Sequence, residues 1–293
     1  MAVADIAPVS AAFLATQGWG DRSSWFDFAV RTDGVHAVVA VDEDGALIGT
    51  GATSIHGTVA WIGSIWVRPD RRGEHIGWRL TEHTIEVAEA AGCRTLVLVA
   101  SEMGRPIYER MGFSTLTFEP VLEAPGLSTD DGRAGSTPLD RSATSTATAN
   151  TDPDRRIRPW RATDLDAAAA LDRRATGEDR RHLLAAFATP ETAFVITGVD
   201  DVPRGFVVRA SWGGGATIAP DPDDALALLD TRRRVAGPDK VVRAGLMESN
   251  LNGLTRLEAD GWIENWRARR MIRGEPLDWD PDAIWGQFNH ALG

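Results

Sequence analysis

The chain carries the same order of secondary-structure signals twice, and this internal duplication limits its fold more than any other feature. Each copy within the 293 residues reads strand, strand, strand, helix, strand, helix, strand. The matched segments are residues 36–41 and 193–197, 46–51 and 205–209, 65–70 and 217–221, 77–91 and 223–235, and 95–100 and 241–246. The closing segments, 101–113 and 250–262, align without a gap. Strands that alternate with helices in this way predict a duplicated α/β domain.

A polar segment at residues 124–155 separates the two copies. It consists mostly of Ser, Thr, Ala, Asp and Gly, and this composition buries too little apolar surface to offset the entropy lost on ordering. The sequence therefore predicts two tandem domains with a mixed α/β (α+β) sheet, at residues 1–123 and 156–293, joined by a flexible, disordered linker. We expect the second domain to end in a helix at 281–292, where apolar residues recur at helical spacing.

The second copy begins with a predicted strand at residues 156–159, followed by a helix that starts at Asp164. This helix start aligns with residues 5–8 of the first copy, so the matching first strand would lie before Met1. We therefore expect either that the first domain lacks this strand or that the true start codon lies upstream.

Composition and charge exclude several classes of protein. The 42 acidic residues outnumber the 31 arginines and lysines, for a net charge of −11, so a basic face that binds nucleic acid is not expected. The single cysteine, Cys93, excludes an internal disulfide and a cysteine-based metal site. No apolar run approaches the roughly 20 residues that span a bilayer, and the N-terminus shows no secretion signal. We expect a cytoplasmic protein that uses no metal.

Residues 65–80 carry the clearest chemical signal. A strand ends before Pro69, three arginines lie between residues 68 and 72, and Gly73 and Gly77 bracket the start of a helix. A turn with few side chains lets backbone N–H groups approach an anion, and the helix N-terminus adds a favourable dipole. We interpret the segment as a phosphate or diphosphate site; the alternative is a solvated turn before an ordinary helix.

The same segment resembles motif A of the GNAT superfamily, the acetyl-CoA-dependent N-acetyltransferases, whose pattern is Arg/Gln-x-x-Gly-x-Gly/Ala. Arg72, Ile76 and Gly77 match this pattern, and His75 stands at its fourth position in place of glycine. A second family signature, Asn-x-x-Ala-x-x-Leu-Tyr-x-x-x-Gly-Phe, is similar to residues 101–113. Two signatures in the right order are more specific than either alone.

In the second signature Ser101 stands at the usual asparagine and Gly104 at the usual alanine, while Tyr108 and the Gly-Phe pair at 112–113 match. The resemblance covers roughly residues 13–119. The tandem arrangement, with a divergent second copy, is similar to the YitH/HolE-type branch of the superfamily.

The resemblance implies a GNAT fold in which the fourth and fifth strands splay apart and hold acetyl-CoA between them. The residues implied to contact the pantetheine arm are Ile65, Trp66 and Val67. The residues implied to hold the diphosphate are Arg72, Gly73, Glu74, His75, Ile76, Gly77 and Trp78, with Ser101 completing the cofactor site. Tyr108, the only tyrosine of the chain, is implied as the general acid that protonates the CoA thiolate, a role that suits a phenol with a pKa near 10. The alternative is that its ring only packs on the strand at 93–100.

The acceptor side of the site is less clear from the sequence. No carboxylate lies on the strand at 61–65, and Glu102, His56 and Asp21 are candidate bases only because loops could bring them near the cleft. For each of them, surface solvation is the alternative. Trp19 and Trp25 are candidates either for an apolar acceptor wall or for the core.

Two departures from the family pattern bear on activity. His75 replaces a glycine, but histidine tolerates left-handed backbone better than most residues, so we expect CoA binding to persist, perturbed at most. The second copy has Pro-Asp-Asp-Ala at 222–225, which puts acid where a phosphate would bind, and Leu257 replaces the tyrosine. We therefore expect a non-catalytic second domain that acts as a scaffold or an acceptor-site wall, with His290 in a structural role.

The sequence supports two hypotheses of function. In the first, the chain transfers an acetyl group from acetyl-CoA directly to a primary amine, either a small molecule or a peptide N-terminus, with Tyr108 as the acid. In the second, it is an acyl-CoA-binding sensor or pseudoenzyme without turnover. In either case we expect a monomer or a homodimer without nucleic-acid or membrane partners.

Overall fold

The structure is a computed structural model that describes residues 23–128, 155–210, 212 and 214–293. The helices are α2 (Ser23–Arg31), α3 (Ile76–Ala90), α4 (Arg105–Arg110), α5 (Leu165–Thr176), α6 (Arg181–Phe187), α7 (Pro222–Ala236) and α8 (Leu251–Ala259), with short 3-10 helices η2 (Pro69–Arg71), η4 (Ala162–Asp164) and η5 (Pro281–Ala283). The strands are β1 (Val35–Val41), β2 (Leu47–His56), β3 (Val59–Val67), β4 (Thr95–Ala100), β5 (Ser114–Pro125), β6 (Arg156–Pro159), β7 (Ala193–Thr197), β8 (Pro203–Arg209), β9 (Gly215–Ile218), β10 (Val241–Gly245), β11 (Ile263–Gly274) and β12 (Ile284–Gly286).

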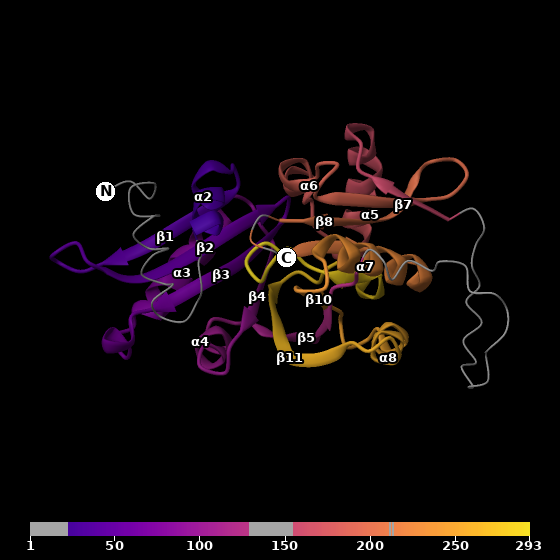
Figure 1. The fold of residues 1–293 in the computed structure, drawn as a ribbon. Coiled ribbons are helices and arrows are strands. Elements are labelled where there is room, and N and C mark those ends of the chain that lie inside the picture. The colour runs from indigo at the N-terminus through magenta and orange to yellow at the C-terminus, as the bar shows by residue number, and fades with distance from the viewer. Residues whose placement is uncertain (1–22, 129–154, 211, 213) are drawn as a thin grey trace.

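The strands of the described residues form two sheets, in the orders β1-β2-β3-β4-β11-β5-β10 and β12-β9-β8-β7-β6. The pair β3–β4 is parallel, and the other pairs are antiparallel. Helix α3 packs against β1, β2 and β3, and α7 packs against β7 to β10 in the second half. Figure 1 shows the two halves side by side, with β11 and β5 between them. The mixed α/β fold expected from the duplication is therefore confirmed.

The two halves exchange equivalent strands, β5 of the first copy and β11 of the second. Strand β11, from the second copy, lies between β4 and β5 of the first copy, and β5 in turn lies between β11 and β10. In the register of this pair, Glu119 faces Ala268. These two residues are each the sixth of a 12-residue strand, so equivalent positions of the duplication meet at one point. A pseudo-twofold axis passes there, and one continuous sheet joins both halves.

A single buried cation strengthens the contact between the halves. Arg270 of β11 lies between the rings of Trp61 and Trp279, with its guanidinium carbon 4.6 and 4.9 Å from their centroids. One of its nitrogens is 3.3 Å from a carboxylate oxygen of Glu178, and both side chains are buried. Burial lowers the pKa of Arg270, and burial raises the pKa of Glu178. The exchanged strand is thus fixed by charge and aromatic packing as well as by its backbone.

The helix expected at 281–292 is wrong. That segment forms η5 and then β12, which pairs antiparallel with β9. Trp285 of β12 is fully buried, and its ring nitrogen donates to the carbonyl of Ala219 at 3.1 Å. The apolar residues there do repeat at helical spacing, but residues 284–286 pair with the open edge of β9 and bury Trp285, and this tertiary pairing outweighs the local period.

The predicted linker begins later than expected. Strand β5 continues to Pro125, Ala124 within it is buried, and the amides of Gly126 and Leu127 donate to the carbonyls of Lys240 and Arg233. These residues are therefore tied to the second half. The rest of the expected linker, residues 129–154, lies outside the described residues, as does the N-terminal segment that aligns with Asp164.

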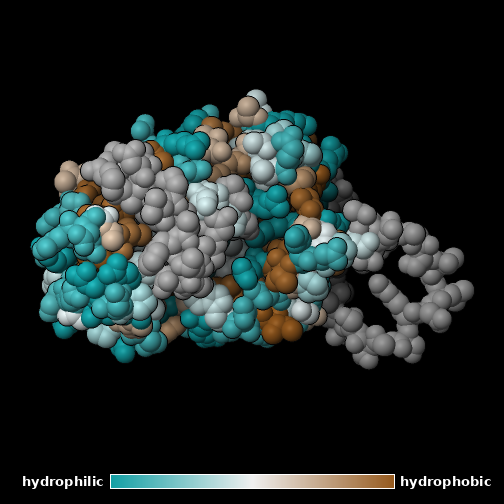
Figure 2. Space-filling view, turned by 60° about the vertical axis from the view of Figure 1, so that its left-hand side comes forward, coloured by the Kyte–Doolittle hydropathy of each residue, from teal (hydrophilic) through white to brown (hydrophobic). Residues whose placement is uncertain are grey.

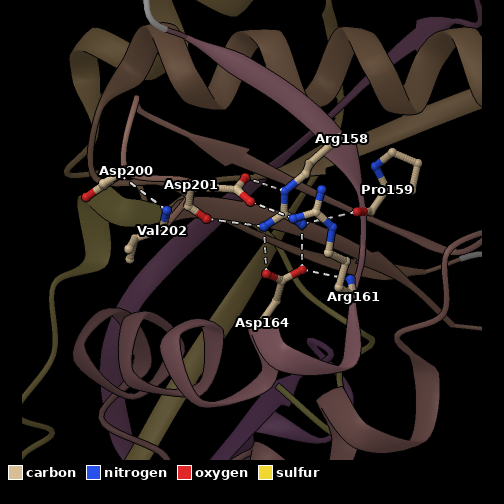
Figure 3. Close-up of polar contacts among 7 residues, drawn as sticks. All are labelled: Arg158, Pro159, Arg161, Asp164, Asp200, Asp201 and Val202. Atoms are coloured by element: carbon tan, nitrogen blue, oxygen red, sulfur yellow. Dashed lines mark hydrogen bonds and ion pairs between the residues drawn. The ribbon is translucent and has the colours of Figure 1, made fainter.

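The second half begins with β6, at the residues where the sequence predicts its first strand. Arg158 of this strand donates two 2.8 Å hydrogen bonds to Asp164 and one of 2.7 Å to Asp201, as Figure 3 shows. Asp164 also accepts from the backbone amide of Arg161 at 2.7 Å. This network joins the strand, the start of α5 and the β7–β8 turn.

The surface of the described residues is mixed in character. Figure 2 shows mostly hydrophilic side chains on the face drawn, with hydrophobic areas that are separate from one another. Within the described ranges, no helix combines the length and apolar character needed to cross a membrane.

Candidate active site

Strands β3 and β4 pair only over their first halves. Their register runs from Val59 opposite Thr95 to Ile62 opposite Leu98, and there it stops. Strand β3 continues to Val67 and β4 to Ala100 without further pairing between them. The strands therefore open apart, and the backbone of residues 63–67 keeps an unpaired edge on the β4 side.

A β-bulge in β3 interrupts the regular strand at this edge. The register between β2 and β3 shifts opposite Gly51, and Ser64 has a positive φ of 53°. The hydroxyl of Thr50 donates a 2.8 Å hydrogen bond to the carbonyl of Ser64 and holds the bulge in place. The side chain of Trp66 is buried in the core, whereas Ile65 and Val67 are partly exposed. The backbone of Ile65, Trp66 and Val67, the residues predicted to contact pantetheine, therefore forms the unpaired edge of β3 at the opening.

The turn before α3 is open and exposed. Gly73 and His75 both have left-handed backbone, with φ of 87° and 60°. The pair Arg71–Glu74 closes the turn through two 2.8 Å hydrogen bonds, and this pairing lowers the pKa of Glu74. No side chain caps the N-terminus of α3 in the described residues. Because the first amides of a helix have no partner within it, this end presents free N–H groups to the solvent.

A cavity of about 690 Å³ begins at the β3–β4 opening and continues between the two halves of the molecule. The first half contributes residues of α2, β3, β4, α4 and β5, and the second half contributes β10, β11 and the segment 286–291. The aromatic residues of its lining are Trp25, Phe26, Tyr108, Trp212, Trp266 and Phe288. A second half that closes a site of the first half is the arrangement expected of an acceptor-site wall.

Tyr108 lies at the mouth of this cavity, between packing and solvent. Its ring packs edge-on against Phe113, with centroids 6.2 Å apart, and lies against Gly104, where a Cβ would come within 2.8 Å of the ring. Its hydroxyl has no hydrogen-bond partner in the part of the chain that the structure describes. Burial raises the pKa of Tyr108 to about 12. The ring therefore packs on the core, and its hydroxyl remains protonated and available to a ligand.

Ser101 has a local structural role that its counterpart in the second half shares. The Ser101 hydroxyl accepts a 3.1 Å hydrogen bond from the amide of Gly104, at the start of α4. In the second half, Asn250 accepts a 2.8 Å hydrogen bond from the amide of Gly253 at the start of α8. Serine and asparagine both cap helices in this way. Ser101 also lines the cavity, so the structure brings it together with Ile65 and Tyr108.

Of the sequence-predicted bases, the two that the structure describes, Glu102 and His56, do not line the cavity. Glu102 is exposed and pairs with Arg105 and Arg269. His56 is fully buried, stacked on His182 at 5.2 Å, and burial lowers its pKa. Asp21 and Trp19 lie outside the described residues. Of the aromatic candidates, Trp25 lines the cavity and is also buried in the core.

Three polar residues meet in the cavity in a way that the sequence did not indicate: Glu119 and Gln287 were not singled out, and His290 was expected to be structural. Glu119 of β5 is buried and accepts a 2.6 Å hydrogen bond from Gln287, and His290 lies 3.6 Å from its other oxygen. A carboxylate within the apolar strand 118–122 is the one signal that pointed to Glu119. Gln287 and His290 carry no such signal, because the partner strand and the folded-back segment that bring them to Glu119 are tertiary features.

The equivalent cleft of the second half is closed. Strand β12 lies along β9, where a ligand would pair with the strand edge, and packs against β10 on its other side. The side chain of Asp221 accepts hydrogen bonds of 2.9 and 3.0 Å from the amides of Asp223 and Asp224, so the N-terminus of α7 is already capped. Leu257, at the position of Tyr108, is fully buried. In the second half, β12 therefore occupies the strand edge and Asp221 occupies the helix N-terminus that a ligand would need.

Comparisons with known proteins give a family match in the first half only and structural matches across both halves. Residues 7–113 match the model of the Acetyltransferase (GNAT) family. Among curated proteins, none matches the chain. Solved structures, in contrast, resemble it over most of its length, across both halves.

Three of these structures extend over the tandem arrangement. A Pyrococcus horikoshii protein assigned as an acetyltransferase has a TM-score of 0.70 at 19% identity, over 92% of this chain and 85% of its own. A GCN5-related N-acetyltransferase from Sphaerobacter thermophilus has a TM-score of 0.62 at 18% identity, over 95% and 96%. A tandem GNAT protein from the clavulanic acid biosynthesis pathway has a TM-score of 0.53 at 13% identity, over 86% and 88%. At these identities the likeness establishes a shared fold.

Proposed function

We propose, from the match of residues 7–113 to the model of the GNAT acetyltransferase family, that this chain transfers an acetyl group from acetyl-CoA to a primary amine. The family match supports acyl transfer in general. Acetyl-CoA as the donor, an amine as the acceptor and direct attack without an acyl-enzyme are the proposal. The acceptor is a small-molecule amine or a peptide N-terminus, and the acting form is a monomer or a homodimer in the cytoplasm. The YitH/HolE-type assignment within the superfamily stays a prediction.

One observation carries the proposal: Tyr108 lines the cavity that begins where β3 and β4 separate, and the uncapped start of α3 lies next to the end of the same strand, since a Cβ at Gly77 would come 3.5 Å from Val67. The unpaired edge of residues 63–67 suits an amide-bearing arm that pairs as an added strand would. The free amides before and within the first turn of α3 suit a diphosphate. Tyr108 lines the cavity beside Ser101 and Val99. The residues present therefore fit acetyl-CoA.

In this proposal the residues that bind acetyl-CoA, hold the amine and donate a proton lie in different parts of the cavity. Acetyl-CoA supplies a thioester carbonyl that an amine can attack. The edge of β3 fixes the arm, and the walls from the second half hold the amine close, so much of the rate comes from orientation. Tyr108 donates its hydroxyl proton to the sulfur as the bond to carbon breaks.

The second half acts in this proposal as the wall of the cavity on the side where the amine binds, and not as a second catalytic centre. Its cleft is filled by β12 and its anion site by Asp221. Its residues reach the cavity through β10, β11 and the segment 286–291.

Calorimetric titration of acetyl-CoA tests the binding part of the proposal. We expect one site per chain. A Gly77→Asp variant, which places a carboxylate beside the free amides of α3, should weaken binding at least about tenfold through charge repulsion. Gly198→Ala is the matched control, because a Cβ at Gly198 meets only ordinary contacts of 3.6 Å or more. Absence of binding by the unmodified protein would remove the cofactor assignment.

Thiol release from acetyl-CoA across a panel of primary amines tests the transfer part. We expect release that depends on the amine and exceeds hydrolysis. Binding of acetyl-CoA without amine-dependent release would favour the sensor or pseudoenzyme instead. The left-handed backbone of His75, at a position that the family fills with glycine, is the observation in favour of that second candidate.

A further inference from the structure

The acceptor side of the cavity contains a carboxylate, an amide and an imidazole that the proposed function does not use. Glu119 has only 3% of its side chain exposed. The Nε2 atom of Gln287 donates to one of its oxygens at 2.6 Å, and the Nε2 atom of His290 lies 3.6 Å from the other. The segment 287–290 therefore faces both oxygens of this buried carboxylate.

The sheet register puts Glu119 close to the β3–β4 opening. Ala100, at the end of β4, pairs with Arg269, and Arg269 pairs with Phe118. Because neighbouring strands are about 4.8 Å apart, the backbone of Phe118 lies about 10 Å from the end of β4. Glu119 is the next residue, and its side chain points to the other face, toward the cavity. This separation leaves room for an amine and a thioester carbonyl between them.

The imidazole, unlike the carboxylate, is reachable from the cavity. His290 has 32% of its side chain exposed, and its ring meets the edge of Trp266 with centroids 5.1 Å apart. With Nε2 directed at a carboxylate, Nδ1 is left to accept a proton. The other titratable groups that line the cavity are Tyr108, Arg232 and Arg243.

The remaining walls are aromatic. Trp25 and Trp212 meet edge to face at 5.6 Å, and Phe26, Trp266 and Phe288 complete the lining. Aromatic faces attract a cation and bury an apolar body. The cavity is therefore suited to a ligand that is charged at one end and apolar at the other.

We propose, building on the proposed function, that His290 is the base for the acceptor amine, that Glu119 is the residue that positions it, and that the acceptor is a primary amine with an aromatic or apolar body. Glu119 holds the ring through Nε2 and stabilises it when it becomes charged, as a buried carboxylate does for a catalytic histidine. Gln287 fixes the orientation of the carboxylate.

The protons and bonds balance in this scheme. The ammonium of the acceptor gives one proton to Nδ1 of His290, which releases it to solvent. The neutral nitrogen forms a bond to the thioester carbon, and the carbon–sulfur bond breaks. Tyr108 gives its proton to the sulfur. The second proton lost from nitrogen as the amide forms passes through His290 and solvent back to the phenolate.

The test compares the unmodified protein with His290→Gln and Glu119→Gln, and uses His83→Gln and Glu102→Gln as controls. Both control side chains are exposed, at 58% and 74%. Circular dichroism checks the fold, and His290→Asn is the second variant if His290→Gln unfolds. The probes are acetyl-CoA with 2-phenylethylamine or ethanolamine, assayed by thiol release from pH 5.5 to 9.5.

We expect kcat/KM at least about tenfold higher for 2-phenylethylamine than for ethanolamine, because the apolar walls bind its ring. His290→Gln should lower kcat/KM about 100-fold and remove the acidic limb of its pH profile. Glu119→Gln should lower it about tenfold, because a neutral amide stabilises the charged ring less. Affinity for acetyl-CoA should stay within about threefold in every variant.

Quenching of tryptophan fluorescence by 2-phenylethylamine provides a readout that needs no turnover, because three tryptophans line the cavity. We expect Glu119→Gln to weaken this binding at least about fivefold and Glu102→Gln to leave it unchanged. If acetyl-CoA does not bind, the proposed function fails, and the fluorescence result still decides the acceptor site. Unchanged pH profiles in the His290 variants, equal use of the two amines, or no binding of 2-phenylethylamine would each overturn the inference.

Discussion

At the scale of single residues, two side chains define the limits of the proposed chemistry. Tyr108 combines a packed ring with an unbonded hydroxyl, so its position is fixed while its proton stays available. His75 adopts a backbone conformation that costs a side-chain-bearing residue about 1 kcal/mol or more. The free amides of α3 begin at this strained position, so the strain is found where the anion site is expected.

Replacing Tyr108 by phenylalanine should lower kcat by about 10²- to 10⁴-fold and leave the affinity for acetyl-CoA within about threefold, since only the proton donor is removed. An acid must hold its proton, so activity is lost as pH rises through its pKa. Because burial raises that pKa to about 12, no alkaline limb from Tyr108 is expected below about pH 11. A rate unaffected by the substitution would contradict the assigned role.

Substitutions at His75 should separate strain from binding. His75→Gly relieves the left-handed strain but adds freedom to the unfolded chain, so we expect the free energy of unfolding to change by less than about 1 kcal/mol. His75→Val should destabilise the protein by about 1–2 kcal/mol, because a β-branched residue tolerates this backbone poorly. Urea denaturation measures both variants. Equal stability for the two would show that the backbone there relaxes freely.

Asp164 provides a test of pH-dependent stability. Burial alone would raise its pKa, but the bonds from Arg158 and the amide of Arg161 hold that pKa below its ordinary value (Figure 3). A carboxyl with a lowered folded-state pKa stabilises the protein above its unfolded pKa, near 3.9, and loses this effect as pH falls through the folded value.

Asp164→Asn should therefore lower the free energy of unfolding by about 2–3 kcal/mol at pH 7, because it leaves Arg158 without its main partner. The difference from the unmodified protein should shrink below about pH 4. Asp166→Asn is the control on the same helix, since Asp166 is 85% exposed and an exposed pair contributes little. Urea denaturation at pH 7 and pH 3 gives both comparisons, and a difference that persists at pH 3 would argue against the ion pair.

At the scale of elements, the two α-helices that begin the equivalent clefts differ in one respect. Helix α3 begins without a side-chain cap, and α7 begins with Asp221 bonded to two of its amides. The strand edges differ in the same sense, because β3 is open beyond Ile62 while β9 is paired with β12. One half of the duplication thus keeps its polar backbone groups for a ligand, and the other satisfies them internally.

The contact between β3 and the segment 287–293 should be sensitive to one methyl group. A Cβ at Gly63 would lie 2.5 Å from the Cβ of Ala291 and 3.0 Å from the carbonyl oxygen of His290. We expect Gly63→Ala to destabilise the protein by about 1–3 kcal/mol and to lower amine-dependent thiol release more than acetyl-CoA affinity, because it displaces the acceptor wall. Thermal unfolding, calorimetry and the thiol assay measure these effects beside the Gly198→Ala control. Equal effects on release and affinity would place the disturbance in the cofactor cleft.

At the scale of the whole molecule, the exchange of β5 and β11 makes the halves interdependent. Removing the second half would leave β4 and β5 on either side of a gap that β11 fills. It would also expose Trp61, which is fully buried under Arg270. The seven-stranded sheet therefore depends on strands of both halves, whereas the five-stranded sheet consists of second-half strands alone.

Residues 1–128 and 155–293 should consequently assemble into a one-to-one complex when produced together as two chains. The described contacts between the halves would all be kept in this complex. Each fragment produced alone should aggregate or unfold without a cooperative transition, because an unfilled sheet exposes apolar faces and unpaired backbone. Size-exclusion chromatography and circular dichroism distinguish these outcomes. A first fragment that folds alone with a sharp transition would show that the exchange is dispensable.

The sequence by itself determined the local elements of this protein. The strands β1, β4, β7 and β10, the helices α3 and α7, and the exposed turn before α3 follow from hydrophobic period, β-branched runs and Gly/Pro positions, which act within a few residues. The duplication indicated that the halves share one fold. The position of Tyr108 beside the opening followed from the resemblance of residues 101–113 to a family signature.

Only the tertiary structure decided which strands complete which sheet. Strand β11 pairs with β4 as readily as with a strand of its own copy, because backbone hydrogen bonds between strands do not depend on how far apart the strands are in the sequence. The same reason explains the failed helix at 281–292, since the open edge of β9 outweighed a helical period. Glu119 meets His290 across 171 residues of chain, and no local pattern records such a contact. The proposed acceptor wall therefore depends on tertiary contacts between the halves, whereas the proposed donor site follows from one short stretch of sequence.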